Sequence, residues 1–117
     1  MQKRKKKQVS IEELKQKKEK LLQQKEKITA RMIKVLKDAK FTETEALYLL
    51  RVVNSFTMLD LAIGNTKLTE SLWDADRFQS QGHLDKEHAE KMANLVLLSV
   101  KKELAIIKCE RSILNNL

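Results

Sequence analysis

The sequence predicts an all-α protein in which a long, basic, coiled-coil-like N-terminal helix precedes a compact bundle of three to four helices. The 117 residues contain no proline, two glycines and few aromatic residues. An all-β protein needs frequent turns and many β-branched or aromatic residues, so this composition argues against one. Abundant Leu, Lys, Glu, Gln and Ala are typical of long helices. The 42% apolar content suffices for the core of one domain.

The first expected helix covers residues 11–40 and follows a flexible basic tail at residues 1–10. Ser10 and Glu13 have the spacing of a capping box, which predicts the helix start. Apolar residues then recur with a heptad period, as in a coiled coil. Lys18 and Lys25 interrupt one of the two apolar registers, so we expect a narrow and weak seam. The chain is compatible with this helix either projecting from the bundle or packing back on it.

A helical bundle is expected over residues 41–117. Thr42 and Glu45 form a second capping-box pattern that starts its first helix. The alternative is one continuous helix of some 50 residues, because neither Gly nor Pro separates the two segments. Gly64, Thr69 and Asp85 mark the further boundaries, as a C-terminal cap and two N-caps. The expected helices of the bundle cover residues 43–63, 69–79 and 86–115.

The last expected helix is too long for the two before it to cover. At 1.5 Å per residue it extends about 45 Å, and apolar side chains occupy most of its circumference. It therefore needs the N-terminal helix or a second chain as cover, which predicts a homo-oligomer or a helical protein partner. We expect the helix–helix interface to be formed by Leu14, Leu21, Ile28, Val35, Val96, Val100, Leu104 and Ile107.

Positive charge is concentrated at the N-terminal end of the chain. Residues 1–40 hold 15 Lys/Arg and 5 Asp/Glu, whereas the remaining residues hold 9 and 11, for a total net charge of +8. This asymmetry favours contact with an acidic partner, although a merely well-solvated lysine-rich helix would look the same. Lysines outnumber arginines 13 to 2 in the first segment, which argues against base-specific readout. The predicted contact residues are Lys3, Arg4, Lys5, Lys6, Lys7, Lys15, Lys18, Lys25 and Arg31, and further lysines continue the charge around the helix.

Enzymatic motifs are not apparent in the sequence. Two isolated glycines cannot form a phosphate-binding loop. His83 and His88 flank Asp85, and we interpret this acidic stretch as a helix start rather than a metal site. Cys109 lies on the apolar side of its helix, where a buried small hydrophobe is the expected role. We therefore expect no catalytic residues, no metal and no cofactor.

The lone cysteine and the absence of a signal peptide or of a long apolar run favour a cytoplasmic or otherwise intracellular protein without an integral membrane segment. The sequence-based hypothesis is a non-enzymatic helical assembly or adaptor protein. It would self-associate or bind a helical partner, and its basic helix would contact an acidic partner. The alternative is a small accessory protein that binds nucleic acid without sequence preference through residues 2–40.

Overall fold

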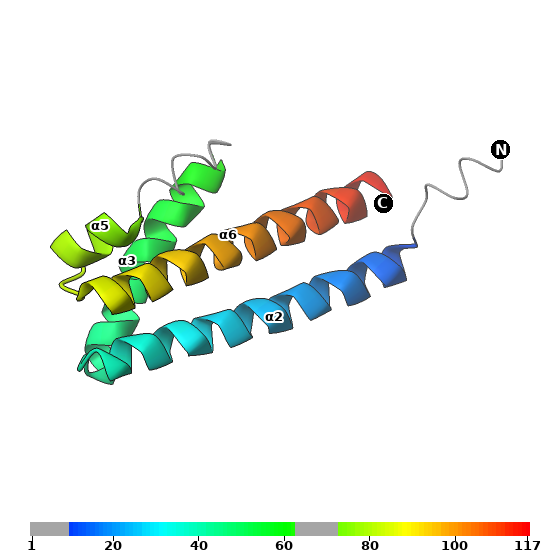
Figure 1. Cartoon of the computed structure of the whole chain (residues 1–117). Coiled ribbons are helices and arrows are strands. Elements are labelled where there is room, and N and C mark those ends of the chain that lie inside the picture. The colour runs from blue at the N-terminus through cyan, green and yellow to red at the C-terminus, as the bar shows by residue number, and fades with distance from the viewer. Residues whose placement is uncertain (1–9, 63–72) are drawn as a thin grey trace.

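The computed structural model describes residues 10–62 and 73–117, and helices account for most of them (Figure 1). No strand occurs within these two ranges, so the predicted all-α class is confirmed. The long N-terminal helix is also present as expected. The helices are α2 (Ile11–Asp38), α3 (Glu43–Ala62), α5 (Ala75–Ser80) and α6 (Lys86–Asn115).

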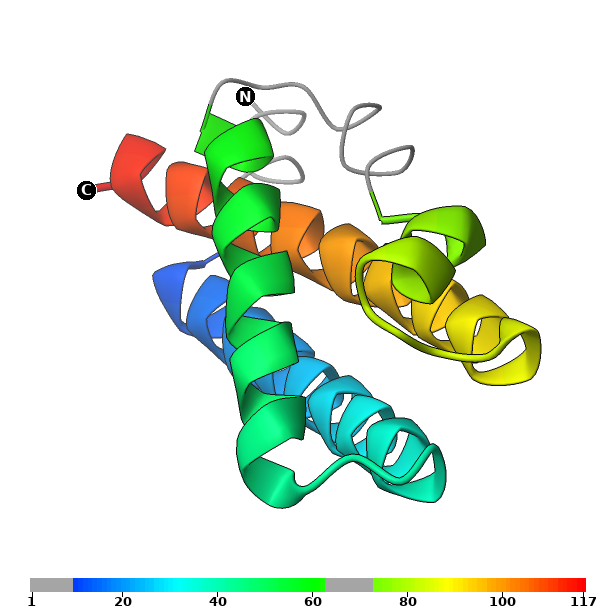
Figure 2. The same ribbon diagram turned by 90° about the vertical axis from the view of Figure 1, so that its left-hand side faces the viewer.

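Helices α2 and α6 lie side by side and run in opposite directions (Figures 1 and 2). They are 28 and 30 residues long, and the contact between them is the most extensive between any two of the described helices. Helix α3 crosses this pair at a steep angle, and α5 packs on α6 (Figure 2). The cover that the sequence predicts for the last helix is thus supplied within the chain by α2.

Capping residues define the helix starts as the sequence predicts. Ser10 Oγ accepts a hydrogen bond from the Glu13 N–H at 3.1 Å. Thr42 and Glu45 cap reciprocally. The Thr42 N–H donates to Glu45 Oε1 at 2.8 Å, and the Glu45 N–H donates to Thr42 Oγ1 at 3.1 Å. Between the end of α2 at Asp38 and the Thr42 cap the chain leaves the helical conformation, and Lys40 has a positive φ of 75°. The single continuous helix considered as an alternative is therefore wrong.

The third expected helix differs from the structure. The sequence predicts it at residues 69–79, of which 69–72 lie outside the described residues, whereas the described helix α5 begins at Ala75 and ends at Ser80. Asp74 has an extended backbone and its side chain accepts from the Arg77 N–H at 2.9 Å, so it acts as the N-cap and excludes Trp73 from the helix. The expected caps at Gly64 and Thr69 lie outside the described residues.

The core lies where α3 and α5 meet the α2–α6 pair. Leu36, Phe78 and Met92 are fully buried and come from α2, α5 and α6 respectively. Trp73 is 3% exposed and its ring centroid lies 4.9 Å from that of Phe78, which supports a packing role for this residue. The hydrophobic cluster is thus built from residues far apart in sequence.

One side of α3 is less covered than its composition suggests. The helix is apolar around most of its circumference, which is typical of a helix packed on more than one side. Ala46, Leu50 and Val53 are buried against the other helices. On the opposite side, four large apolar or aromatic side chains are more than half exposed among the described residues. These side chains are Leu47, Tyr48, Met58 and Leu59.

Candidate functional site

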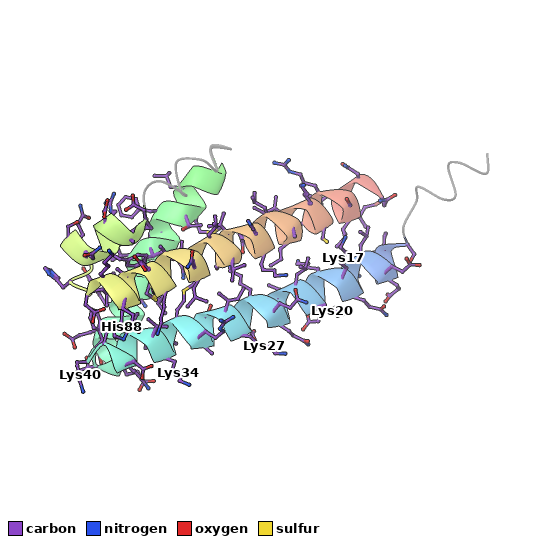
Figure 3. All side chains as sticks on the ribbon, viewed as in Figure 1. Lys17, Lys20, Lys27, Lys34, Lys40 and His88 are labelled. Atoms are coloured by element: carbon purple, nitrogen blue, oxygen red, sulfur yellow. The ribbon has the colours of Figure 1, made fainter. Side chains whose placement is uncertain are left out.

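A row of exposed cations follows one flank of α2, and we call it the cationic stripe. The stripe consists of Lys17, Lys20, Lys27, Arg31 and Lys34, all of which are exposed. Their spacings of three, seven, four and three residues place them within about 100° of arc on a helix with 3.6 residues per turn. At 1.5 Å per residue the row extends about 26 Å. Figure 3 shows its four lysines distributed along α2.

The position of the stripe follows from how α2 packs. Leu14, Ile28, Met32 and Leu36 are buried and recur at helical spacing, so they fix one face of α2 against the rest of the chain. The stripe occupies the flank beside that buried face. Because the apolar face anchors the backbone, the cations are presented in a fixed row rather than on a freely moving arm.

A groove lies between α2 and α6 at one end of the stripe, with a volume of about 520 Å³. Cations stand on both of its sides, because Arg31 and Lys34 come from α2 and Lys91 from α6. Leu98, 41% exposed, contributes an accessible apolar surface. We call this feature the α2–α6 groove. Its remaining lining residues are Val35, Asp38, Asn94 and Leu95.

Lys18 and Lys25, two of the sequence-predicted contact residues, lie outside the stripe. Lys18 Nζ is 3.2 Å from Glu110 Oε2, and Lys25 forms an ion pair with Glu103. Both lysine side chains are about one-third exposed, so their ammonium groups are directed to carboxylates of α6. The chain itself partly neutralises these two charges, which makes them poor contacts for an outside partner.

The remaining predicted contact residues are Lys15, Arg31 and the cations from Lys3 to Lys7. Lys15 is exposed but lies on another part of the helix surface, and Arg31 belongs to both the stripe and the α2–α6 groove. The cations from Lys3 to Lys7 lie outside the described residues. Lys17, Lys20, Lys27 and Lys34 are among the further lysines that the sequence shows around the helix, but they were not singled out as contact residues. Their helical spacing is the sequence signal that could have identified them.

The residues predicted to form a helix–helix interface pack within this one chain. Leu14, Ile28, Val96 and Val100 are buried, each less than 10% exposed. The other four members of the set are partly buried on the same two helices. Packing of α2 on α6 therefore uses the surface that these residues would offer to a second chain. The partly buried members are Leu21, Val35, Leu104 and Ile107.

The histidine-containing segment forms a helix cap. Asp85 Oδ1 accepts from the His88 backbone N–H at 2.8 Å, and His88 Nδ1 lies 2.6 Å from the same oxygen. The backbone hydrogen bond, followed by the ring contact, lowers the pKa of Asp85 below its ordinary value of 3.8. His83 is exposed in the preceding turn. Across residues 10–62 and 73–117, no three His, Cys, Asp or Glu side chains gather closely enough to hold a metal ion.

Comparisons of the chain with protein-family models, curated proteins and solved structures found no match. Among the helices of the described residues, none combines the length and the apolar character needed to cross a membrane. The surface of the molecule itself, and the cationic stripe and the α2–α6 groove in particular, therefore indicate its function.

Proposed function

We propose that the protein is a non-catalytic helical adaptor that binds an acidic macromolecular surface through the cationic stripe of α2. The observation that supports this function is the alignment of five exposed cations on one flank of an anchored helix. Within the described part of the chain, none of the five is ion-paired with a carboxylate. A row of like charges repels itself, and an acidic partner relieves that repulsion.

The exposed side of α3 supports the second contact that an adaptor needs. Leu47, Met58 and Leu59 are each more than half exposed, and apolar exposure of this kind is typical of protein–protein contact surfaces. Met58 borders a cavity that Lys25 and Glu103 of the α2–α6 seam also line, whereas no member of the cationic stripe lines that cavity. In the proposal, a second copy or a helical partner therefore binds at α3, while the stripe remains free for the acidic partner.

A nucleic acid is the second candidate partner, and the composition of the stripe favours this possibility. Four of its five members are lysines, which contact phosphates as point charges without reading base sequence. Such binding weakens steeply as salt rises, because counterions are released from the nucleic acid. This candidate predicts affinity for a duplex of any sequence.

The test reverses the charge of the stripe and compares it with a matched control. The stripe variant combines Lys20→Glu, Lys27→Glu and Lys34→Glu. The control combines Lys101→Glu, Lys108→Glu and Arg111→Glu on α6, which are exposed and change the net charge equally. Fluorescence anisotropy would measure binding of both variants and the wild type to labelled polyglutamate and to a short DNA duplex at low salt.

We expect the stripe variant to lose about tenfold in affinity for polyglutamate, since three exposed pairs at about 0.5 kcal/mol each amount to about 1.5 kcal/mol. The control should lose much less. Equal losses in both variants would mean that net charge alone governs binding, and this would contradict the proposal. Binding of the duplex without binding of polyglutamate would favour the nucleic-acid candidate instead.

A further inference from the structure

We infer that the α2–α6 groove binds an acidic amphipathic helix of a partner protein. The inference rests on the proposed function and names the class of acidic partner. The groove combines two kinds of surface that such a helix would need. Its sides carry Arg31, Lys34 and Lys91, and its apolar lining includes the 41% exposed Leu98.

The apolar lining distinguishes this partner from a phosphate backbone. Leu95 is buried and Val35 partly buried, so Leu98 extends an apolar surface that begins in the core. A polyanion that contacts only the cations gains nothing from covering Leu98. A helix with an apolar side buries that leucine, and burial of apolar area is worth about 25 cal/mol per Å².

The spacing of the cations suits carboxylates on a helix. Arg31 and Lys34 are three residues apart on α2 and both are exposed. Residues three or four apart are neighbours on a helix surface, so Glu residues at i and i+3 or i+4 of the partner can reach both cations. Lys91 faces them from α6, across the groove. A partner helix with acidic residues on both edges of its apolar side would therefore meet cations on both sides of the groove.

Two carboxylates of the chain itself set limits on this arrangement. Lys91 Nζ lies 3.3 Å from Glu87 Oε1, but both side chains are more than half exposed, so the pair is weak and can be exchanged. Asp38 lines the groove close to the end of α2. It repels carboxylates there, so the acidic residues of the partner should cluster near Arg31 rather than near Asp38.

The test uses two labelled synthetic peptides of equal charge. The amphipathic peptide is helical, with leucines at every third or fourth position and glutamates on both sides of the leucine stripe. In the polar peptide, glutamines replace the leucines. Affinities would be measured for the wild type, for Leu98→Ser in the groove and for Leu114→Ser, an exposed leucine near the end of the same helix. Circular dichroism would verify that the variants are folded.

We expect Leu98→Ser to weaken binding of the amphipathic peptide about fivefold and to leave binding of the polar peptide unchanged. Leu114→Ser should alter neither. If the wild type binds both peptides equally and Leu98→Ser has no effect, the groove inference is overturned while the proposed function stands. If the wild type binds neither peptide and no polyglutamate, the proposed function fails as well. Arg31→Glu should weaken the binding of both peptides.

Discussion

Lys25 of α2 forms an ion pair with Glu103 of α6 inside the seam between the two helices. One heptad away, Lys18 pairs with Glu110, so lysines and glutamates seven residues apart meet in register. Since α2 and α6 are antiparallel, a shift of either helix would separate both pairs at once (Figure 1). These contacts therefore favour one alignment of an otherwise apolar seam, much as polar seam residues fix register in coiled coils.

The first prediction concerns this ion pair. Glu103→Lys places a second ammonium group beside that of Lys25. The site is largely shielded from solvent, because the Glu103 side chain is 14% exposed and the Lys25 side chain is 30% exposed. We expect a loss of about 2 kcal/mol in the free energy of unfolding, between the values for exposed and buried pairs. Combining Lys25→Glu with Glu103→Lys should restore most of it. Urea denaturation of both single variants and the double variant gives the coupling energy.

The more exposed pair provides the control. Glu110 is 48% exposed, so Glu110→Lys should cost about 0.5 kcal/mol. If the double swap at Lys25 and Glu103 were as unstable as the sum of the single variants, the two side chains would not interact, and the proposed role in helix alignment would be wrong.

The second prediction concerns the core. Leu36 is fully buried where α2 meets the other helices. Leu36→Ala should lower the free energy of unfolding by about 3 kcal/mol, since it removes apolar contacts and leaves a cavity. Leu114→Ala, at a position 68% exposed, should change it by less than about 0.5 kcal/mol. Similar losses from the two substitutions in urea denaturation would contradict the observed packing.

Local signals explain why most helix boundaries could be predicted. Ser10, Thr42 and Asp85 each precede a helix and cap it by accepting a hydrogen bond from the backbone N–H of the residue three positions later. Such bonds depend on adjacent residues alone, so the sequence reveals them directly. Asp74 caps α5 in the same way, but it stands inside a run of residues that appears continuously helical in the sequence. The start of α5 could therefore not be predicted from the capping residue alone.

The surface chemistry was harder to predict because it depends on contacts distant in sequence. Lys18 and Lys25 look like defects in a heptad when α2 is considered alone, yet their partners lie on α6, near the other end of the chain. The α2–α6 groove likewise needs Arg31 and Lys91 to be brought together by folding. No local pattern encodes either relationship.

The third prediction concerns the turn between α5 and α6. A Cβ atom at Gly82 would lie 2.7 Å from the backbone oxygen of Phe78, which accepts a hydrogen bond from the Leu84 N–H. Gly82→Ala must therefore displace backbone and should cost about 1–3 kcal/mol in the free energy of unfolding. Gln81→Ala, at the exposed neighbouring position, should cost less than about 0.5 kcal/mol. Equal stability of Gly82→Ala and the wild type in urea denaturation would show that the turn is more open than described.

The fourth prediction concerns the pH dependence of the α6 cap. The hydrogen bond from the His88 backbone N–H, together with the nearby His88 ring, lowers the pKa of Asp85 below 3.8 in the folded protein. A group whose folded pKa is lowered contributes stability that is present above its ordinary pKa and is lost as the pH falls through the folded value. Asp85→Asn keeps an oxygen that can accept the same N–H but removes the charge from the positive end of the helix dipole.

We therefore expect Asp85→Asn to unfold at a lower temperature than the wild type near neutral pH. The difference between the two melting temperatures should shrink as the pH falls below about 3.8, because the wild-type carboxylate becomes protonated. Glu90→Gln removes an equal charge from an exposed position beyond the first turn of α6 and should show a smaller difference at every pH. Thermal unfolding followed by circular dichroism would measure both series. A difference for Asp85→Asn that stayed constant down to the lowest pH would mean that the amide disturbs the cap geometry and that ionisation of Asp85 does not stabilise α6.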